Sequence, residues 1–388
     1  MHTFTYLIAA AGLLQGATAA FNMDSATNVA VYWGQNSNGT QKDLGSYCND
    51  MSIDTIMLSF LNIFKGQGGQ PEYDFSNACS KGNGVFPGTD LPQCQFLASQ
   101  IKSCQDVNKI VTLSLGGGGN NSVGFDNDGD AQSFATTIWN EFLGGNSSTR
   151  PLGDVVLDGV DLDIESGSDQ HYDTFVNQLR SLANGAPKPL YVTGAPQCVQ
   201  PDSHLNAAML NSSLDAITTR RATCLTPPCV PYLILPILIA PTNRRTTRAS
   251  TSPPGKVAQT IHARCNSPRR GHRDEFARTK AKNPKMKVYI GAPASDQAAG
   301  SGYVNIDSFK QIITSVQKNF TSFGGVMLYD ASQAQANDNY EVAVKSTLLA
   351  NADAPGAGTN VPPKRDAVGK VAADADRPRV RSRFFRLE

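Results

Sequence analysis

The stretch VLDGVDLDIESG, from Val156 to Gly167, decides the fold of this chain. It carries four carboxylates among apolar residues, namely Asp158, Asp161, Asp163 and Glu165. Successive side chains of a strand point to opposite faces, so the last three carboxylates share one face. The other face then carries Val160, Leu162 and Ile164. This pattern is typical of a barrel strand whose apolar face meets the helices and whose acidic face looks inward.

The rest of the 388-residue chain repeats strands with helical stretches between them. Seven β-rich runs are visible, at residues 28–35, 55–64, 109–117, 155–165, 189–197, 286–295 and 324–332. Such alternation predicts a parallel sheet. A gap after the fifth run leaves room for one more strand, and eight strands close a (β/α)₈ TIM barrel of ordinary size. A doubly wound open sheet is the alternative, but no GxGxxG turn follows the first strand.

The N-terminal residues 1–20 are expected to be a signal peptide. An apolar run at residues 4–14 is too short to span a bilayer and precedes small residues, which predicts cleavage near Ala20. We therefore expect a secreted, extracellular protein, free or associated with a cell wall. Secretion makes the eight cysteines candidates for disulfides. Five glycosylation sequons fit a secreted surface, at Asn38, Asn120, Asn146, Asn211 and Asn319.

An arginine-rich segment interrupts the pattern. Ten arginines lie between Thr218 and Asn283, whereas residues 284–363 contain none. The segment has three possible interpretations: a basic surface loop, an insert that binds polyanions, or residues that do not come from native coding sequence. A shifted reading frame or a retained intron would produce the third. The segment's lack of hydrophobic periodicity favours the third. The predicted organisation is a barrel over 21–350, interrupted at 218–276, and a disordered tail over 351–388.

The acidic strand predicts acid catalysis. Carboxylates that face a confined interior repel one another, so at least one is expected to stay protonated near neutral pH, as a general acid requires. Glu165 lies at the C-terminal end of the strand, where barrel active sites are found. Pairing with basic groups is disfavoured because the neighbouring strands hold few of them. A divalent cation is a competing explanation, but five histidines without a ligand-like pair argue against a zinc enzyme. We expect neither a metal nor a cofactor.

Several motifs resemble glycoside hydrolase family 18. DGVDLDIE matches the DxxDxDxE signature of that family at all four acidic positions, and LSLGG matches its SxGG motif with Ser114, Gly116 and Gly117. YWGQN at 32–36, GAPQC at 194–198, GAPAS at 291–295 and GSGYV at 300–304 resemble the plant and fungal class III, hevamine-like chitinases. The similarity covers about residues 28–217 and 277–350.

The resemblance implies a secreted endochitinase that acts on chitin or chito-oligosaccharides with retention of configuration. Glu165 would protonate the glycosidic oxygen while the 2-acetamido group of the substrate attacks the anomeric carbon. Asp163 would orient that group, and Asp161, supported by Ser114, would share a proton or hydrogen bond with Asp163. The expected supporting residues further include Asp158, Gly116 and Gly117, and the expected sugar-binding residues are Tyr32, Gln197 and Tyr329. We expect a monomer without a nucleic-acid partner.

The sequence departs from the family at two places. No QFYNN-like motif follows Ile217, and Tyr329 stands where the family has a tryptophan. We therefore expect a missing sixth strand, a missing substrate-holding tyrosine, exposed strand edges and weak or absent activity. A non-catalytic chitin-binding lectin or inhibitor on the same barrel is the second hypothesis, because a fold does not fix a function.

The resemblance also implies two disulfides, Cys48–Cys104 and Cys79–Cys94. Cys198 would pair in the sixth-strand region. Cys224, Cys229 and Cys265 all lie in the arginine-rich segment, so the partner of Cys198 stays unassigned.

Overall fold

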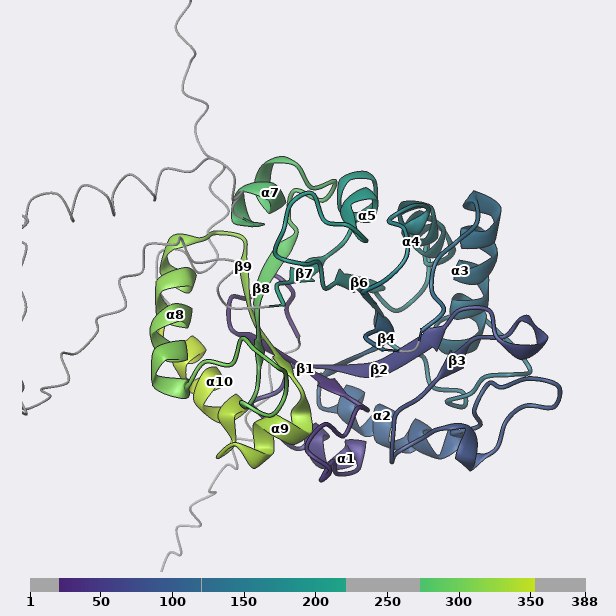
Figure 1. Ribbon diagram of the computed structural model, residues 1–388, viewed down its shortest axis with the longest axis horizontal. Coiled ribbons are helices and arrows are strands. Elements are labelled where there is room, and N and C mark those ends of the chain that lie inside the picture. The colour runs from purple at the N-terminus through teal and green to yellow at the C-terminus, as the bar shows by residue number, and fades with distance from the viewer. Residues whose placement is uncertain (1–20, 120, 221–272, 353–388) are drawn as a thin grey trace, which may run out of the picture.

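A computed structural model describes residues 21–119, 121–220 and 273–352 of the chain (Figure 1). The predicted signal peptide, most of the arginine-rich segment and all but two residues of the predicted tail lie outside these ranges. The three interpretations of the arginine-rich segment are therefore untested for residues 221–272.

Eight parallel strands form a closed barrel, which confirms the predicted (β/α)₈ fold class. The ring runs β1-β9-β8-β7-β6-β5-β4-β2 and closes through pairing of β1 with β2. These strands are β1 Asn28–Trp33, β2 Thr55–Ile63, β4 Ile110–Gly117, β5 Gly159–Ile164, β6 Tyr191–Gly194, β7 Ala216–Thr218, β8 Lys287–Pro293 and β9 Phe323–Tyr329. A two-residue strand outside the ring, β3 Glu72–Tyr73, pairs antiparallel with β2.

The expectation of a missing sixth strand is wrong. Strand β7 occupies that place with only three residues, pairing Ala216 and Ile217 with β6 and Ala216 to Thr218 with β8. Ile217 is itself part of this strand, whereas the motif of the sixth strand was expected to follow Ile217. All three residues are buried, and this short segment joins β6 to β8 by backbone pairing. The barrel has no open edge at this position.

The helices lie outside the ring of strands (Figure 1). They are α1 Leu44–Cys48, α2 Ala98–Asp106, α3 Asp128–Phe142, α4 Tyr172–Leu182, α5 Asn206–Asn211, α7 Arg273–Thr279, α8 Ile306–Asn319, α9 Ala331–Ala336 and α10 Tyr340–Ala350. In α4, Tyr172, Phe175, Val176 and Leu179 are buried, at the three- and four-residue spacing of one helix face. None of the described helices is both long and apolar enough to cross a membrane.

The predicted two faces of the acidic strand are confirmed. Val160, Leu162 and Ile164 belong to the core between the strands and the helices, and each is at most 1% exposed. A smaller apolar cluster fills the inside of the ring, formed by Ala30, Tyr32, Met57, Phe60, Ala216, Tyr289 and Met327. The acidic face of β5 therefore looks into a barrel interior that has an apolar lining.

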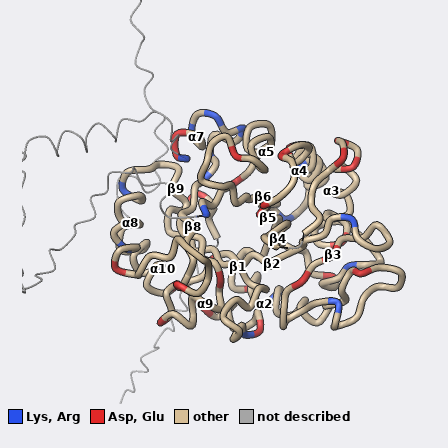
Figure 2. Tube along the Cα trace, in the orientation of Figure 1, with Lys and Arg blue, Asp and Glu red and all other residues tan. Residues whose placement is uncertain are grey.

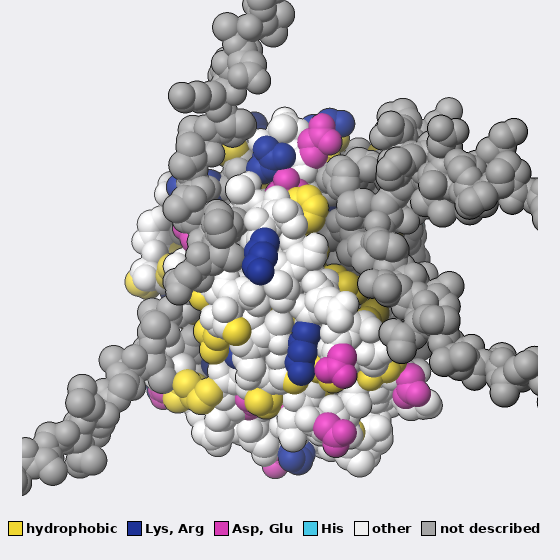
Figure 3. All heavy atoms as spheres, turned by 90° about the vertical axis from the view of Figure 1, so that its left-hand side faces the viewer, with side chains coloured by type: hydrophobic (Ala, Val, Ile, Leu, Met, Phe, Trp, Pro, Cys, Tyr) yellow, Lys and Arg dark blue, Asp and Glu magenta, His cyan; other side chains and the backbone are white. Residues whose placement is uncertain are grey.

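Positions of Lys and Arg and positions of Asp and Glu both occur around the outside of the described Cα trace (Figure 2). On the face turned to the viewer in Figure 3, the visible Lys and Arg side chains are separated from one another. The parts of this face not covered by grey atoms thus show no continuous basic patch.

Both disulfides implied by the resemblance are present. Cys48 is bonded to Cys104, with their Cα atoms 4.5 Å apart, and Cys79 to Cys94, with a Cα separation of 6.2 Å. Cys198 is disulfide-bonded as well. The other three cysteines lie outside the described residues.

Candidate active site

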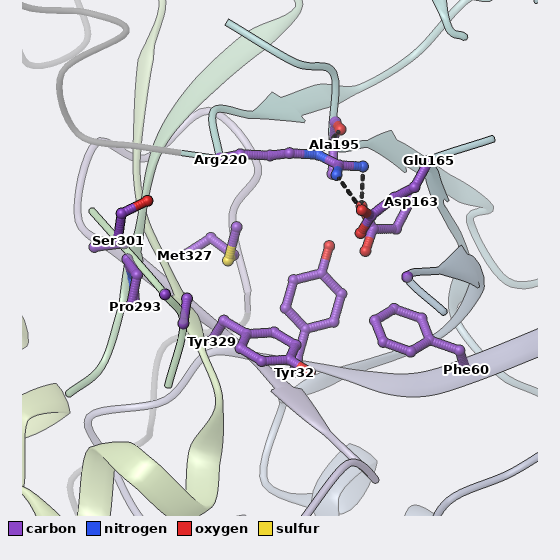
Figure 4. Close-up of a pocket in the computed structure, with 14 residues that line it drawn as sticks. Tyr32, Phe60, Asp163, Glu165, Ala195, Arg220, Pro293, Ser301, Met327 and Tyr329 are labelled. Carbon is purple, nitrogen blue, oxygen red and sulfur yellow. Dashed lines mark hydrogen bonds and ion pairs between the residues drawn. The ribbon is translucent and has the colours of Figure 1, made fainter. Parts of the chain in front are cut away.

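A cavity of about 400 Å³ opens at the C-terminal ends of the barrel strands. Its lining comes from β1, β2, β5, β8 and β9 and from residues that follow β4, β5, β6, β7 and β8 (Figure 4). The lining residues are Tyr32, Phe60, Gly118, Asp163, Glu165, Ala195, Arg220, Ala292, Pro293, Ala299, Gly300, Ser301, Met327 and Tyr329. Two of the three predicted catalytic carboxylates therefore face one cavity.

Asp161 lies beneath this cavity and is fully buried. Its Oδ2 accepts hydrogen bonds from the hydroxyls of Tyr32, at 3.1 Å, and Ser114, at 2.8 Å. Its Oδ1 accepts one from the hydroxyl of Thr193, at 2.6 Å. Burial raises the pKa of Asp161, and the three hydrogen bonds oppose that rise because they stabilise the charged form. The predicted support of Asp161 by Ser114 is thus seen as a direct hydrogen bond.

Asp163 lies on the same face, one step nearer the mouth of the barrel. Burial raises its pKa to about 7, Arg220 opposes the rise, and the charges of Asp161 and Glu165 add to it. The Nη2 atom of Arg220 donates a hydrogen bond of 2.7 Å to Oδ1 of Asp163. A carboxyl group with a pKa near 7 can hold or release a proton at neutral pH.

Glu165 follows β5 and reaches the cavity with its side chain 36% exposed. Its Oε2 lies 2.9 Å from Nη1 of Arg220. One guanidinium group therefore bridges the two carboxylates at the mouth of the barrel (Figure 4). The expectation that these carboxylates lack basic partners is wrong, because Arg220, two residues beyond the short strand β7, pairs with both of them.

Gly116 and Gly117 bring β4 close to the acidic strand. Gly116 has φ +106°, and a Cβ atom there would lie 2.4 Å from the carbonyl oxygen of Asp163. Gly117 has φ +80°, and its Cβ atom would lie 2.6 Å from the ring of Phe60. Both positions require glycine for conformation and for space. The predicted supporting role of the SxGG motif therefore has a steric basis.

Comparison with known proteins identifies the family. The model of glycosyl hydrolases family 18 matches residues 28–220. Acidic endochitinase SE2 of Beta vulgaris is 31% identical to this chain over 85% of the chain and 94% of that protein. The chain belongs to glycoside hydrolase family 18. Chitinase 2 of Rhizopus oligosporus is 36% identical over 83% of this chain, and the match spans 52% of that longer protein.

Two solved structures share the fold of this chain. The crystal structure of ICChI chitinase from Ipomoea carnea is 29% identical, with a TM-score of 0.60, over 82% of this chain and 99% of that one. A xylanase and α-amylase inhibitor protein, XAIP-II from Scadoxus multiflorus, is 28% identical, with a TM-score of 0.59, over 82% of this chain and 98% of that one. A chitinase and an inhibitor thus have the same fold, so the residues of the site must decide between these functions.

The aromatic residues of this family 18 cavity lie together. The rings of Tyr32 and Tyr329 have centroids 5.7 Å apart, and those of Tyr32 and Phe60 are 5.6 Å apart. The sequence pointed to the two tyrosines but missed Phe60. Burial raises the pKa of Tyr329, so its hydroxyl stays protonated at neutral pH.

Two predicted residues lie outside the cavity lining. Asp158 precedes β5, at the opposite end of the strand, where it accepts hydrogen bonds from the Val111 amide and from Gln105 and pairs with Lys188 at 2.9 Å. It ties β4 and β5 together rather than facing substrate. Gln197 lies in the loop after β6, where its backbone amide donates a hydrogen bond of 2.6 Å to Asp202. The structure brings neither side chain to the acidic pair.

Arg220, Phe60, Ala195 and Met327 were missed by sequence reasoning. Arg220 was counted only as one of many arginines in an anomalous segment. Its position directly after LDAITT, just beyond the C-terminal end of a barrel strand, was the available signal. Within residues 21–119, 121–220 and 273–352, no group of three or more His, Cys, Asp and Glu side chains is arranged to hold a metal ion.

Proposed function

We propose that this chain hydrolyses the β-1,4 linkages between N-acetylglucosamine units of chitin. The observation that carries the proposal is the row of inward-facing carboxylates on β5, which ends in Glu165 at the cavity mouth above the buried Asp163 and Asp161. This row supplies a proton donor that solvent can reach and a carboxyl group that burial separates from solvent. Membership of family 18 and the chitinase names of its relatives support the choice of substrate.

The proposed reaction has two steps. Glu165 donates its proton to the glycosidic oxygen while the carbonyl oxygen of the 2-acetamido group attacks the anomeric carbon and the glycosidic bond breaks. Asp163 accepts a hydrogen bond from the acetamido N–H and stabilises the positive charge of the oxazolinium ion. Water then attacks the anomeric carbon and gives a proton to Glu165, which restores the acid and retains the configuration. Asp161 is held beneath Asp163 by three hydroxyl donors. Burial raises the pKa of Asp163, and the charge of Asp161 adds to the rise.

The aromatic residues of the cavity fit a sugar polymer. Tyr32, Phe60 and Tyr329 present ring faces in a cavity that also has polar groups, and pyranose rings stack on such faces. We propose that these three residues contact the sugar rings. The predicted signal peptide supports secretion, and N-terminal sequencing of the secreted chain should begin at residue 21.

The test compares wild type with Glu165→Gln on a fluorogenic chitotrioside. We expect a loss of about 10² to 10⁴ in turnover, because general acid catalysis contributes that much. Glu275→Gln, an exposed carboxylate on α7, is the matched control and should keep wild-type turnover. The first product should have the β configuration by NMR. Equal turnover by Glu165→Gln and wild type would refute the proposal.

A second candidate is a non-catalytic chitin-binding protein. The observation that favours it is Arg220, which engages both carboxylates of the acidic pair at once. Binding of chitotetraose by wild type and Glu165→Gln, with equally negligible turnover in both, supports this second function over hydrolysis.

A further inference from the structure

The arginine that bridges the acidic pair is bonded through all three of its guanidinium nitrogens. Nε donates to the carbonyl oxygen of Ala195 at 2.9 Å, Nη2 to Asp163 at 2.7 Å, and Nη1 lies 2.9 Å from Glu165. Figure 4 shows this side chain extending across the cavity toward the two carboxylates. Three contacts of this kind hold a planar guanidinium in one orientation.

This contact opposes the chemistry of the site. A proton donor must carry its proton before it acts, whereas an adjacent guanidinium stabilises the charged form of a carboxyl group. For Asp163 the competition is explicit, because burial raises its pKa to about 7 while Arg220 opposes the rise. Among the described residues, the other titratable groups near the guanidinium or in the same cavity are Asp161 and the phenols of Tyr32 and Tyr329, and none of these carries positive charge.

The barrel does not require the guanidinium for closure. Strand β7 is held to its neighbours by backbone pairing at Ala216 to Thr218, and Arg220 follows two residues later. Its side chain is 22% exposed and lies in the cavity rather than in the core. The contact with Asp163 and Glu165 is therefore a feature of the site and not of the ring.

We infer that Arg220 is a latch on the acidic pair, which holds the carboxylate of Glu165 in an ion pair and must leave Glu165 before that residue can protonate a glycosidic oxygen. This inference rests on the proposed function. Arg220 is a positioning residue, since it acts through Glu165 and not on the reacting bond. The latch should limit kcat more than KM, because it occupies the carboxylate of the proton donor in the bound complex and not the aromatic contacts with sugar.

The test uses Arg220→Gln and Arg220→Lys in the full chain with a fluorogenic chitotrioside. Gln keeps hydrogen-bonding capacity without charge, whereas Lys keeps the charge. We expect Arg220→Gln to raise kcat at pH 7 about tenfold, because a hydrogen bond to a charged group no longer has to break before Glu165 acts, with KM within about twofold. Arg220→Lys should resemble wild type.

Two controls separate the latch from a structural role. Arg278→Gln removes an arginine that pairs with Asp274 on α7 and should leave kcat and KM unchanged. Thermal unfolding of each variant gives the folded fraction by which kcat is corrected. The double variant Arg220→Gln with Glu165→Gln should lose the gained turnover, which assigns the gain to Glu165.

Other outcomes overturn the inference. Corrected turnover by Arg220→Gln that equals or falls below wild type shows that the arginine does not restrain Glu165. Inactivity of both wild type and Arg220→Gln also overturns the inference, because removal of the arginine then produces no turnover. In that case chitotetraose binding separates the two proposals: bound sugar refutes hydrolysis but leaves a sugar site, and absence of binding refutes the proposed substrate as well.

Discussion

The phenol of Tyr32 donates a hydrogen bond of 3.1 Å to Oδ2 of Asp161, across 129 positions of sequence. Tyr32 lies on β1 and Asp161 on β5, with β2 and β4 between them in the ring. Both side chains are buried, at 2% and 0% exposure. The bond therefore crosses the barrel interior and fixes the acidic strand relative to the first strand.

Replacing Tyr32 by Phe removes one of the three donors to Asp161. The pKa of that buried carboxyl, already raised by burial, should rise further, because the lost hydrogen bond favoured the charged form. We expect the free energy of unfolding at pH 7 to fall by about 1–3 kcal/mol, as for a buried acceptor that loses a partner. Urea unfolding measures the change. Tyr329→Phe is the control, since Tyr329 is not among the donors to Asp161, and equal losses in the two variants would contradict the assignment.

Much of the barrel follows from local sequence patterns. The alternation in VDLDI places Val160 and Leu162 outward and the aspartates inward, because a strand has only two faces. The spacing of apolar runs also gives the correct ring. Strand β7 escaped prediction because three residues are too few to show a period. Its closure depends on pairing with β6 and β8, which no local pattern records.

Which residues of the site could be predicted likewise depends on whether a local motif or the folded ring places them. Ser114 and the glycine pair were predicted from the resemblance of LSLGG to the SxGG motif, and the structure sets this motif beside the acidic strand, with Ser114 opposite Asp161. Asp158 belongs to the DxxDxDxE motif but precedes the first residue of β5, so alternation says nothing about its side chain. Arg220 pairs with a residue 57 positions away. Composition grouped it with other arginines, and only the folded ring brings it to Asp163.

Gly116→Ala tests the close approach of β4 to β5. The added Cβ atom would meet the carbonyl oxygen of Asp163 at 2.4 Å in a backbone with φ +106°. Gly124→Ala is a matched control, since Gly124 has φ +122° but no atom within 4 Å of the added Cβ. We expect Gly116→Ala to lower the free energy of unfolding by about 1–3 kcal/mol more than Gly124→Ala, the cost of overpacking beyond the shared backbone strain. Losses that match within error would show that the strands can separate freely.

Glu141 gives a pH dependence that is independent of the active site. It lies on α3 with 3% exposure, its Oε1 accepts a hydrogen bond of 3.0 Å from Thr149, and its Oε2 has no hydrogen-bond partner among the described residues. Burial raises its pKa from 4.5 to about 7, although Thr149 and Arg150 oppose the rise. Because the folded pKa is the higher one, the folded state binds the proton more tightly than the unfolded state. The stability that this carboxyl contributes is therefore full below about pH 4.5 and is lost as pH rises through about 7.

Glu141→Gln should remove that loss, because the amide has the charge of the protonated acid at every pH. Relative to wild type, the variant should gain about 1 kcal/mol or more in free energy of unfolding between pH 5 and pH 8. The comparison cancels the contribution of Asp163, which titrates in the same range in both proteins. Urea unfolding at the two pH values measures the difference, and turnover at each pH should not change because α3 lies outside the ring. Parallel stability profiles for the two proteins would show that Glu141 is ionised in the folded state throughout, with its charge compensated by Arg150.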